Sequence, residues 1–152
     1  QQQSRRVAIL MIELDHFTPA AVGAAAINCN LMYRIEAARV KSALRSSDTV
    51  ARVGERTFAV LLDQVTGPEE VLAIAKKMQG TISLPVTLDA HELFLSSRIG
   101  IGLAAQGCKE TVPLLEAASQ ALVTARAHGY DMCGLPGCAV SANNEVPSPI
   151  AA

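Results

Sequence analysis

The chain has 152 residues, half of them hydrophobic, and a formal net charge of −1 at pH 7. That length suits a single domain with a sizeable buried core. Charges of both signs are interspersed, and the aromatic residues are only two Tyr and three Phe. The chain therefore has neither the basic footprint nor the aromatic platform of a nucleic-acid-binding protein. Its longest apolar runs, residues 7–12 and 19–27, are well short of the ~18 residues that a membrane span needs.

No targeting segment or metal motif is evident. Glu13 and Asp15 close the first apolar run, so it is typical of a strand rather than a signal peptide, and a cytoplasmic location is expected by default. Whether the parent protein is tethered to the membrane stays open. The four cysteines are Cys29, Cys108, Cys133 and Cys138. The last two could form half of a zinc site, but free thiols in a reducing compartment fit the scattered spacing, and we expect no metal site.

The first elements alternate between strand and helix. Residues 7–12 form a continuous apolar run with β-branched residues, which is typical of a strand covered on both faces. Thr18 and Pro19 supply an N-cap and a proline at the first helical position. Apolar residues then recur at helical spacing, which predicts a long helix that ends near Leu44.

The middle of the chain predicts a hairpin followed by a helix. Residues 49–52 and 57–62 are two strand patterns that face each other across a turn containing Gly54. Residues 68–78 have apolar positions at helical spacing, and Gly80 is expected to end that helix.

The last third predicts two further strands and a helix. Residues 82–88 and 92–103 are extended runs on either side of a turn, and residues 112–128 form a helix that the following glycine ends. The order β-α-β-β-α-β-β-α predicts an α/β (α+β) fold, a mixed and mainly antiparallel sheet with helices packed on it. We expect one domain over residues 1–140 and a polar, proline-containing linker over residues 141–152.

Two motifs and a strand carry a resemblance to a known family. Arg45-Ser46-Ser47-Asp48 stands five residues before the turn Gly54-Glu55-Arg56-Thr57-Phe58, and Ser97-Arg98-Ile99-Gly100-Ile101-Gly102 follows later. These segments resemble the core of GGDEF domains, the family that contains the diguanylate cyclases, whose turn reads Gly-Gly-(Asp/Glu)-Glu-Phe. The resemblance covers about residues 7–129 and implies a palm-like fold. The family's first helix, with Leu-Thr-Gly-Leu-Pro-Asn-Arg, has no counterpart here, so we expect a domain truncated at that end.

The resemblance implies altered metal positions. The family places its metal ions on the first Asp of an Asp-x-Asp-x-Phe motif, here Glu13, and on the third residue of the turn, here Arg56. A guanidinium reverses the sign of the interaction with a divalent ion. Glu55 replaces a Gly that lets the backbone approach the nucleotide, and Thr57 replaces a Glu. The alternative to an altered metal site is that Glu13, Asp15 and Arg56 form a purely structural ion pair at the end of a strand. In either case we expect Arg56 within salt-bridge reach of Glu13 or Asp15.

The nucleotide contacts that the resemblance implies are altered as well. The guanine-binding Asn of the family aligns with Ala21, and the guanine-binding Asp aligns with Asn30. An Asn offers one acceptor where an Asp accepts from two guanine donors, and Ala offers none. The family's phosphate-binding Lys-x-x-Gly-Arg stands as Arg126-Ala127-His128-Gly129-Tyr130, which keeps one of the two cations.

The inhibitory product site of the family is the motif that survives. The family binds cyclic di-GMP at Arg-x-x-Asp, and Arg45 and Asp48 have its spacing from the turn. Arg can donate to guanine O6 and N7, while Asp accepts from N1–H and N2–H₂. Lys76 or Lys77 on the following helix would supply a second basic contact. The alternative is ordinary capping by an Arg at a helix end and an Asp in a turn.

Taken with the resemblance, these residues predict a catalytically inactive GGDEF domain that acts as a regulatory or interaction module in cyclic di-GMP signalling, with no resident cofactor. It would bind cyclic di-GMP or pack on a partner domain, with a phosphodiesterase-type domain as the expected neighbour. Three alternatives stay open: an active diguanylate cyclase that uses Mg²⁺ to join two GTP molecules, a GTP-binding domain that activates a linked phosphodiesterase domain, and a structural spacer that binds no nucleotide.

Overall fold

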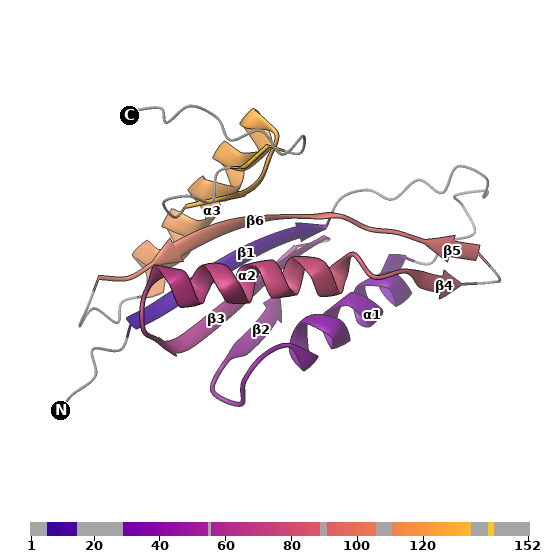
Figure 1. Ribbon diagram of the computed structural model, residues 1–152, viewed down its shortest axis with the longest axis horizontal. Coiled ribbons are helices and arrows are strands. Elements are labelled where there is room, and N and C mark those ends of the chain that lie inside the picture. The colour runs from indigo at the N-terminus through magenta and orange to yellow at the C-terminus, as the bar shows by residue number, and fades with distance from the viewer. Residues whose placement is uncertain are drawn as a thin grey trace.

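The computed structural model describes residues 6–14, 29–54, 56–88, 91–105, 111–134 and 140–141. Their helices and strands are β1 (Arg6–Leu14), α1 (Cys29–Ser42), β2 (Thr49–Arg52), β3 (Thr57–Val65), α2 (Pro68–Ile82), β4 (Val86–Leu88), β5 (His91–Leu93), β6 (Ser97–Leu103), α3 (Thr111–His128), β7 (Tyr130–Cys133) and β8 (Val140–Ser141). One sheet has the order β2-β3-β1-β6-β7-β8, and β4 pairs with β5 in a second, two-stranded sheet (Figure 1). Within the described ranges, no helix is long and apolar enough to cross a membrane.

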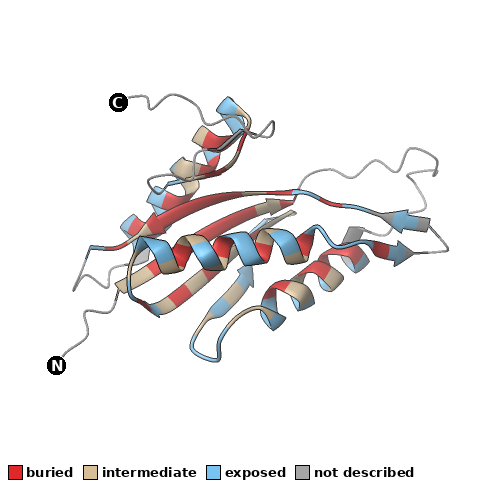
Figure 2. Cartoon of the chain, viewed as in Figure 1, coloured by how far each residue is buried: buried red, intermediate tan, exposed pale blue. Residues whose placement is uncertain are grey.

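The predicted fold class, a mixed and mainly antiparallel sheet with helices packed on it, is confirmed. Strand β1 lies between β3 and β6, antiparallel to both, and β6 and β7 form a parallel pair. Both faces of β1 are covered: Leu10 and Ile12 lie in the core with α1 and α2, whereas Ile9 and Met11 pack against α3. Figure 2 shows β1 and β6 buried along most of their length. This two-sided burial explains the continuous apolar run that predicted the strand.

Helix α3 lies very close to β6 because that strand has glycine at the two positions that face the helix, Gly100 and Gly102. A Cβ atom on Gly100 would lie 2.3 Å from the carbonyl oxygen of Ala118 and 2.4 Å from the amide nitrogen of Leu122. A Cβ atom on Gly102 would lie 2.7 Å from the carbonyl oxygen of Leu114. These contacts are with helix backbone, which cannot move aside as a flexible side chain can. The two glycines therefore set the distance between α3 and the sheet.

Helix α2 is longer than the sequence pattern predicts. Gly80 does not end it, because the helix continues to Ile82 and is capped by Ser83. Its buried stripe keeps helical spacing beyond the glycine: Val71, Ala75, Met78 and Ile82. Burial of Ile82 thus outweighs the low helix propensity of one glycine, and Ile82 is not the start of a strand as predicted.

The predicted strand over residues 92–103 is in fact two strands in different sheets. β5 ends at Leu93 and pairs with β4, whereas β6 begins at Ser97 and joins the main sheet. β7 and β8 were not predicted, since runs of four and two residues carry little periodicity. Ser141, predicted as the first linker residue, lies in β8 opposite Tyr130. The linker itself stays a prediction, because residues 142–152 lie outside the described part.

The remaining boundaries agree closely with expectation. The starts and ends of three elements, β2, β3 and α3, lie within three residues of the predicted positions. Gly129 ends α3 as predicted, with φ of +71°. Helix α1 ends at Ser42, two residues before the predicted Leu44. Its predicted start at Pro19 falls outside the residues that the structure describes.

Glu36 on α1 is a charged side chain buried in the core, with 0% of the residue exposed. Its Oε2 accepts a hydrogen bond from Arg39 Nη1 at 3.3 Å, while Oε1 has no partner among the described residues. Arg39 also donates to the carbonyl oxygens of Leu84 and Pro85, both at 2.6 Å, and so ties α1 to the segment after α2. Burial, opposed by Arg39, raises the pKa of Glu36 to about 7.

Replacing the glycine under α3 tests the close approach. Gly100→Ala is expected to lower the free energy of unfolding by about 1–3 kcal/mol or more, because the added methyl meets helix backbone. Gly80→Ala is the matched control, because a Cβ atom there meets nothing within 4 Å. It should raise that free energy by up to about 1 kcal/mol through helix propensity. Urea unfolding measures both, and similar midpoint shifts for the two variants would contradict this account of the packing.

Glu36 should make stability depend on pH. Its pKa is higher in the folded chain, about 7, than its ordinary value of 4.5, so the folded state binds the proton more tightly. Stability from this group is therefore fully present below pH 4.5 and is lost as the pH rises to about 7. Glu36→Gln should raise the free energy of unfolding at about pH 8 by about 1–3 kcal/mol and flatten that slope. Glu116→Gln, on the exposed side of α3, should leave the slope as it is, and identical pH profiles for both variants would refute the assignment.

Candidate functional site

The turn between β2 and β3 lies beside the end of β1, as predicted. In the pairing of β1 with β3, Glu13 stands opposite Thr57. The amide of Leu14 donates to the carbonyl oxygen of Arg56 at 2.8 Å, and the amide of Gly54 donates to that of Thr57 at 3.2 Å. These bonds bring the first metal position of the family and the signature turn together.

The carboxylate of Glu13 is bound by Arg126 in the last turn of α3. Arg126 Nη2 lies 2.9 Å from Oε2, and Nε lies 3.2 Å from Oε1, so both oxygens accept from one guanidinium. The side chains of Arg126 and Glu13 are 48% and 19% exposed, respectively. Arg126, the predicted phosphate contact, thus pairs with Glu13, a contact that the sequence motifs do not predict.

Of the two carboxylates predicted to pair with Arg56, Glu13 pairs with Arg126. Glu13 follows Ile9 and Met11 at two-residue intervals and so lies on the face of β1 that α3 covers. The partner of Glu13 in the β1–β3 ladder is Thr57, so these two residues share a face of the sheet. Because side chains alternate along a strand, Arg56, the residue before Thr57, belongs to the opposite face. The helix on Glu13's own face supplies the cation instead. Asp15, the alternative partner of Arg56, lies outside the described residues.

Among the described residues, the carboxylate available to a divalent cation at this place is already bound by a cation. Magnesium needs free carboxylate oxygens, and both oxygens of Glu13 accept from Arg126. Within the described residues, no group of three or more His, Cys, Asp or Glu side chains is close enough to hold a metal ion.

The predicted base contacts remain predictions. Ala21 and Glu55 lie outside the described residues. Asn30 lies in the first turn of α1, but its side chain is not among those described.

Arg45 and Asp48 lie at the end of the β2–β3 ladder that is away from the turn. Arg45 Nε and Nη2 donate to the two oxygens of Asp48 at 3.1 and 3.2 Å, and the Arg45 amide donates to Oδ2 at 3.0 Å. The amide of Asp63 donates to Oδ1 at 3.2 Å. Burial of Asp48, whose side chain is 1% exposed, opposes ionisation, but these hydrogen bonds outweigh it and lower its pKa. Asp48 thus joins the end of α1 to β3.

Arg45 also contacts α2, through an acidic residue. Its Nη1 donates to Glu70 Oε2 at 3.2 Å, and Glu70 Oε1 accepts from the amide and the hydroxyl of Thr66 at 2.8 and 3.0 Å. The Thr66 amide is the main reason that the pKa of Glu70 is lowered. Lys76 and Lys77, the predicted basic contacts, are exposed further along the same helix.

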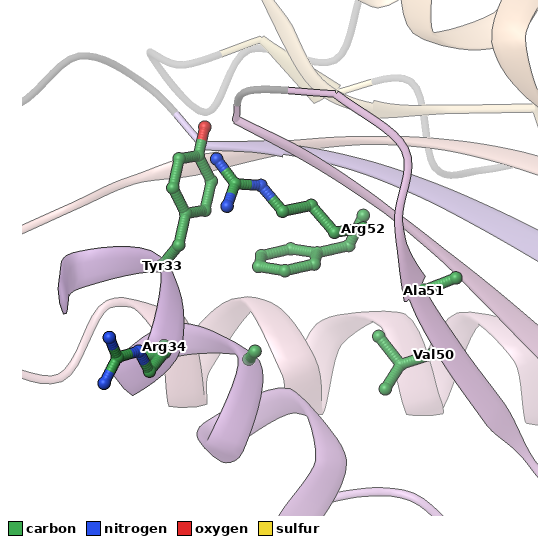
Figure 3. A pocket seen from close by; sticks show the side chains of 7 residues that line it. Tyr33, Arg34, Val50, Ala51 and Arg52 are labelled. Atoms are coloured by element: carbon green, nitrogen blue, oxygen red, sulfur yellow. The ribbon is translucent and has the colours of Figure 1, made fainter. Parts of the chain in front are cut away.

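A cavity of about 460 Å³ lies between α1 and the edge strand β2 (Figure 3). The Arg52 guanidinium carbon lies 3.9 Å from the centroid of the Tyr33 ring, which packs edge-on against Phe58 with centroids 5.8 Å apart. Arg52 Nε also donates to the carbonyl oxygen of Gly54 at 3.0 Å, which links the cavity to the turn. The lining residues are Tyr33, Arg34, Ala37, Val50, Ala51, Arg52 and Phe58. Two guanidinium groups and two aromatic rings suit a planar or anionic ligand.

Sequence reasoning missed the role of Glu70 although a signal was present. Thr66 precedes Glu70 by four residues at the start of a helix, close to the pattern in which an acidic side chain bonds back to the chain before the helix. For Arg126 and Glu13 there was no such signal, because 113 residues separate them in sequence.

A family model described as "Diguanylate cyclase, GGDEF domain" matches residues 1–132. Among curated proteins, the chain is similar to the cyclic di-GMP phosphodiesterase NbdA of Pseudomonas aeruginosa, at 27% identity over 127 residues, covering 84% of this chain and 16% of that protein. It is also similar to the bifunctional diguanylate cyclase/cyclic di-GMP phosphodiesterase MucR of the same species, at 35% identity over 103 residues, covering 67% and 15%.

The fold is similar to the crystal structure of the GGDEF domain of TpbB, also named YfiN, from Pseudomonas aeruginosa. The TM-score is 0.72 at 30% sequence identity, and the match covers 86% of this chain and 84% of that one. The chain spans less than a fifth of the length of NbdA and MucR, at 16% and 15%. Because the family model matches most of the chain and a solved GGDEF domain shares its fold, the chain belongs to the GGDEF domain family.

Proposed function

We propose that this chain is a catalytically inactive GGDEF domain that serves as a regulatory module in cyclic di-GMP signalling. The observation that carries the proposal is the ion pair between Glu13 and Arg126. In the family, a carboxylate at the first of these positions binds metal and a cation at the second binds phosphate. Here the two groups neutralise each other.

The charges at the turn support the proposal. A divalent ion at Glu13 would have to displace a guanidinium that donates to both carboxylate oxygens. Arg56 adds a second positive charge at the position where the family has a metal-binding carboxylate. The pairing of Glu13 with Arg126 and the replacement of a carboxylate by Arg56 both disfavour cation binding relative to a site with two free carboxylates.

The base positions support it independently. Ala21 and Asn30 stand where the family has the Asn and Asp that hold guanine. Because a cyclase must bind both the base and the metal-bound phosphates of GTP, loss of either group of contacts impairs turnover.

The relatives suggest the context in which such a module works. NbdA is described as a cyclic di-GMP phosphodiesterase and MucR as bifunctional, and this chain corresponds to a small part of each. We therefore propose that the domain works beside a phosphodiesterase-type domain and regulates it.

The domain should form no cyclic di-GMP from GTP and Mg²⁺. The expected result in a product assay is no turnover, and rates typical of enzymes, ~1 s⁻¹ or faster, would refute the proposal. Restoring the turn with Glu55→Gly, Arg56→Asp and Thr57→Glu should not rescue activity, because the base contacts are still missing. The matched comparison is the same variant with Ala21→Asn and Asn30→Asp added, because these two changes restore the base contacts as well as the turn. GTP titration with and without Mg²⁺ separates the GTP-binding alternative from the structural spacer.

A second candidate function is the binding of cyclic di-GMP at the Arg-x-x-Asp motif, through Arg45, with Asp48 orienting Arg45 and Lys76 as an additional basic contact. The Arg45 side chain is 42% exposed, and Asp48 holds its guanidinium in one orientation through two hydrogen bonds. A partly exposed and pre-oriented guanidinium suits bidentate recognition of guanine.

Arg45→Ala is expected to weaken binding of cyclic di-GMP by about 1–3 kcal/mol, the range of one bidentate guanine contact. Isothermal titration calorimetry measures the change, and the folded fraction of each variant is checked by its thermal melt. Lys41→Ala, which removes another exposed cation on α1, is the control and should bind as the unmodified domain does. Equal affinity after Arg45→Ala would place the ligand elsewhere and leave Arg45 with its structural role alone.

A further inference from the structure

We propose that Glu70 is a built-in competitor for the ligand of Arg45. Glu70 occupies the part of the guanidinium that a guanine or phosphate group would use, and so it lowers the affinity of the site for cyclic di-GMP. This inference rests on the proposed binding of cyclic di-GMP at Arg45.

The donors of Arg45 are almost fully used within the described part of the chain. A guanidinium has five N–H groups. Nε and Nη2 donate to Asp48, Nη2 donates also to the carbonyl oxygen of Asp63 at 3.1 Å, and Nη1 donates to Glu70. Because Asp48 holds Nε and Nη2, a bidentate contact with guanine must use the Nη1–Nη2 edge of the guanidinium. There the ligand displaces Glu70 and shares Nη2 with the carbonyl oxygen of Asp63.

Glu70 is the partner that is cheapest to displace. Its side chain is 33% exposed and makes one hydrogen bond to Arg45. Asp48 is 1% exposed and also accepts from the amides of Arg45 and Asp63. Exposed ion pairs contribute little, whereas a buried and hydrogen-bonded partner is costly to release. A ligand that reaches Arg45 therefore exchanges with Glu70 and leaves Asp48 in place.

The negative charge of Glu70 stays near the site after this exchange. Its Oε1 is bound by the amide and the hydroxyl of Thr66 at 2.8 and 3.0 Å, independently of Arg45. The same bonds lower the pKa of the carboxyl, so Glu70 is ionised at neutral pH. Because cyclic di-GMP carries two phosphodiester anions, the retained charge opposes it at short range.

The test is a titration with cyclic di-GMP at low ionic strength of the unmodified domain, Glu70→Gln and Glu69→Gln. Gln at position 70 keeps the acceptor for Thr66 and removes the charge. Its Kd should be lower by about two- to fivefold, the size of an exposed ion pair, and the gain should shrink in high salt. Glu69→Gln removes the same charge one residue earlier on the exposed side of α2 and should leave Kd unchanged.

Each outcome is informative. One possible outcome is that Glu70→Gln binds cyclic di-GMP whereas the unmodified domain does not, and that adding Arg45→Ala abolishes this binding. That outcome would support the competitor role in its strongest form. If the unmodified domain binds through Arg45 but Glu70→Gln binds equally or more weakly, or if Glu69→Gln gains as much, the inference is overturned and the proposed ligand site stands. If neither the unmodified domain nor Glu70→Gln binds, both the ligand site and the inference are overturned, while the proposed lack of turnover is unaffected.

Discussion

The close contact between α3 and β6 is the constraint on which the site at the turn depends. With glycine at positions 100 and 102, the helix backbone lies where a side chain would otherwise stand. This approach, together with the apolar contacts of Ile9 and Met11, holds α3 along the face of β1 on which Glu13 lies. Arg126, in the last turn of the helix, is thereby delivered to the carboxylate. A packing feature in the sheet thus decides which cation meets the carboxylate at a position that the family uses for metal.

A carboxylate bound by a guanidinium lies near each end of the β2–β3 hairpin, Glu13 on β1 beside the turn and Asp48 at the other end, but the two pairs differ in kind. The Glu13–Arg126 pair is partly exposed and links two elements far apart in sequence. Asp48 is almost fully buried and also bonds to two backbone amides, so it is part of the framework, with Arg45 as its more accessible partner. A ligand at either pair must therefore compete with internal contacts.

Local sequence patterns predicted the boundaries of most helices and strands correctly where a residue with a strong conformational preference stands at the boundary. Gly129 ends α3 in a left-handed conformation that favours glycine, and the hairpin follows its strand patterns. The patterns failed where packing outweighs propensity. Gly80 lies inside α2 because Ile82 beyond it is buried, and the run over residues 92–103 divides because its two parts join different sheets. The short strands β7 and β8 depend on their neighbours for definition.

The sequence by itself determined the family and the spacing of Arg45 from Asp48, since these are set by residue type and short distances along the chain. Only the tertiary structure decided which cation meets which carboxylate. Arg56 is close to Glu13 in the ladder, but alternation along a strand separates the two faces, and the helix covering Glu13's face brings Arg126. In the same way, the start of α2 brings Glu70, and not a lysine, to Arg45. Ion pairs of this kind depend on which faces of packed elements meet, and sequence spacing does not encode that.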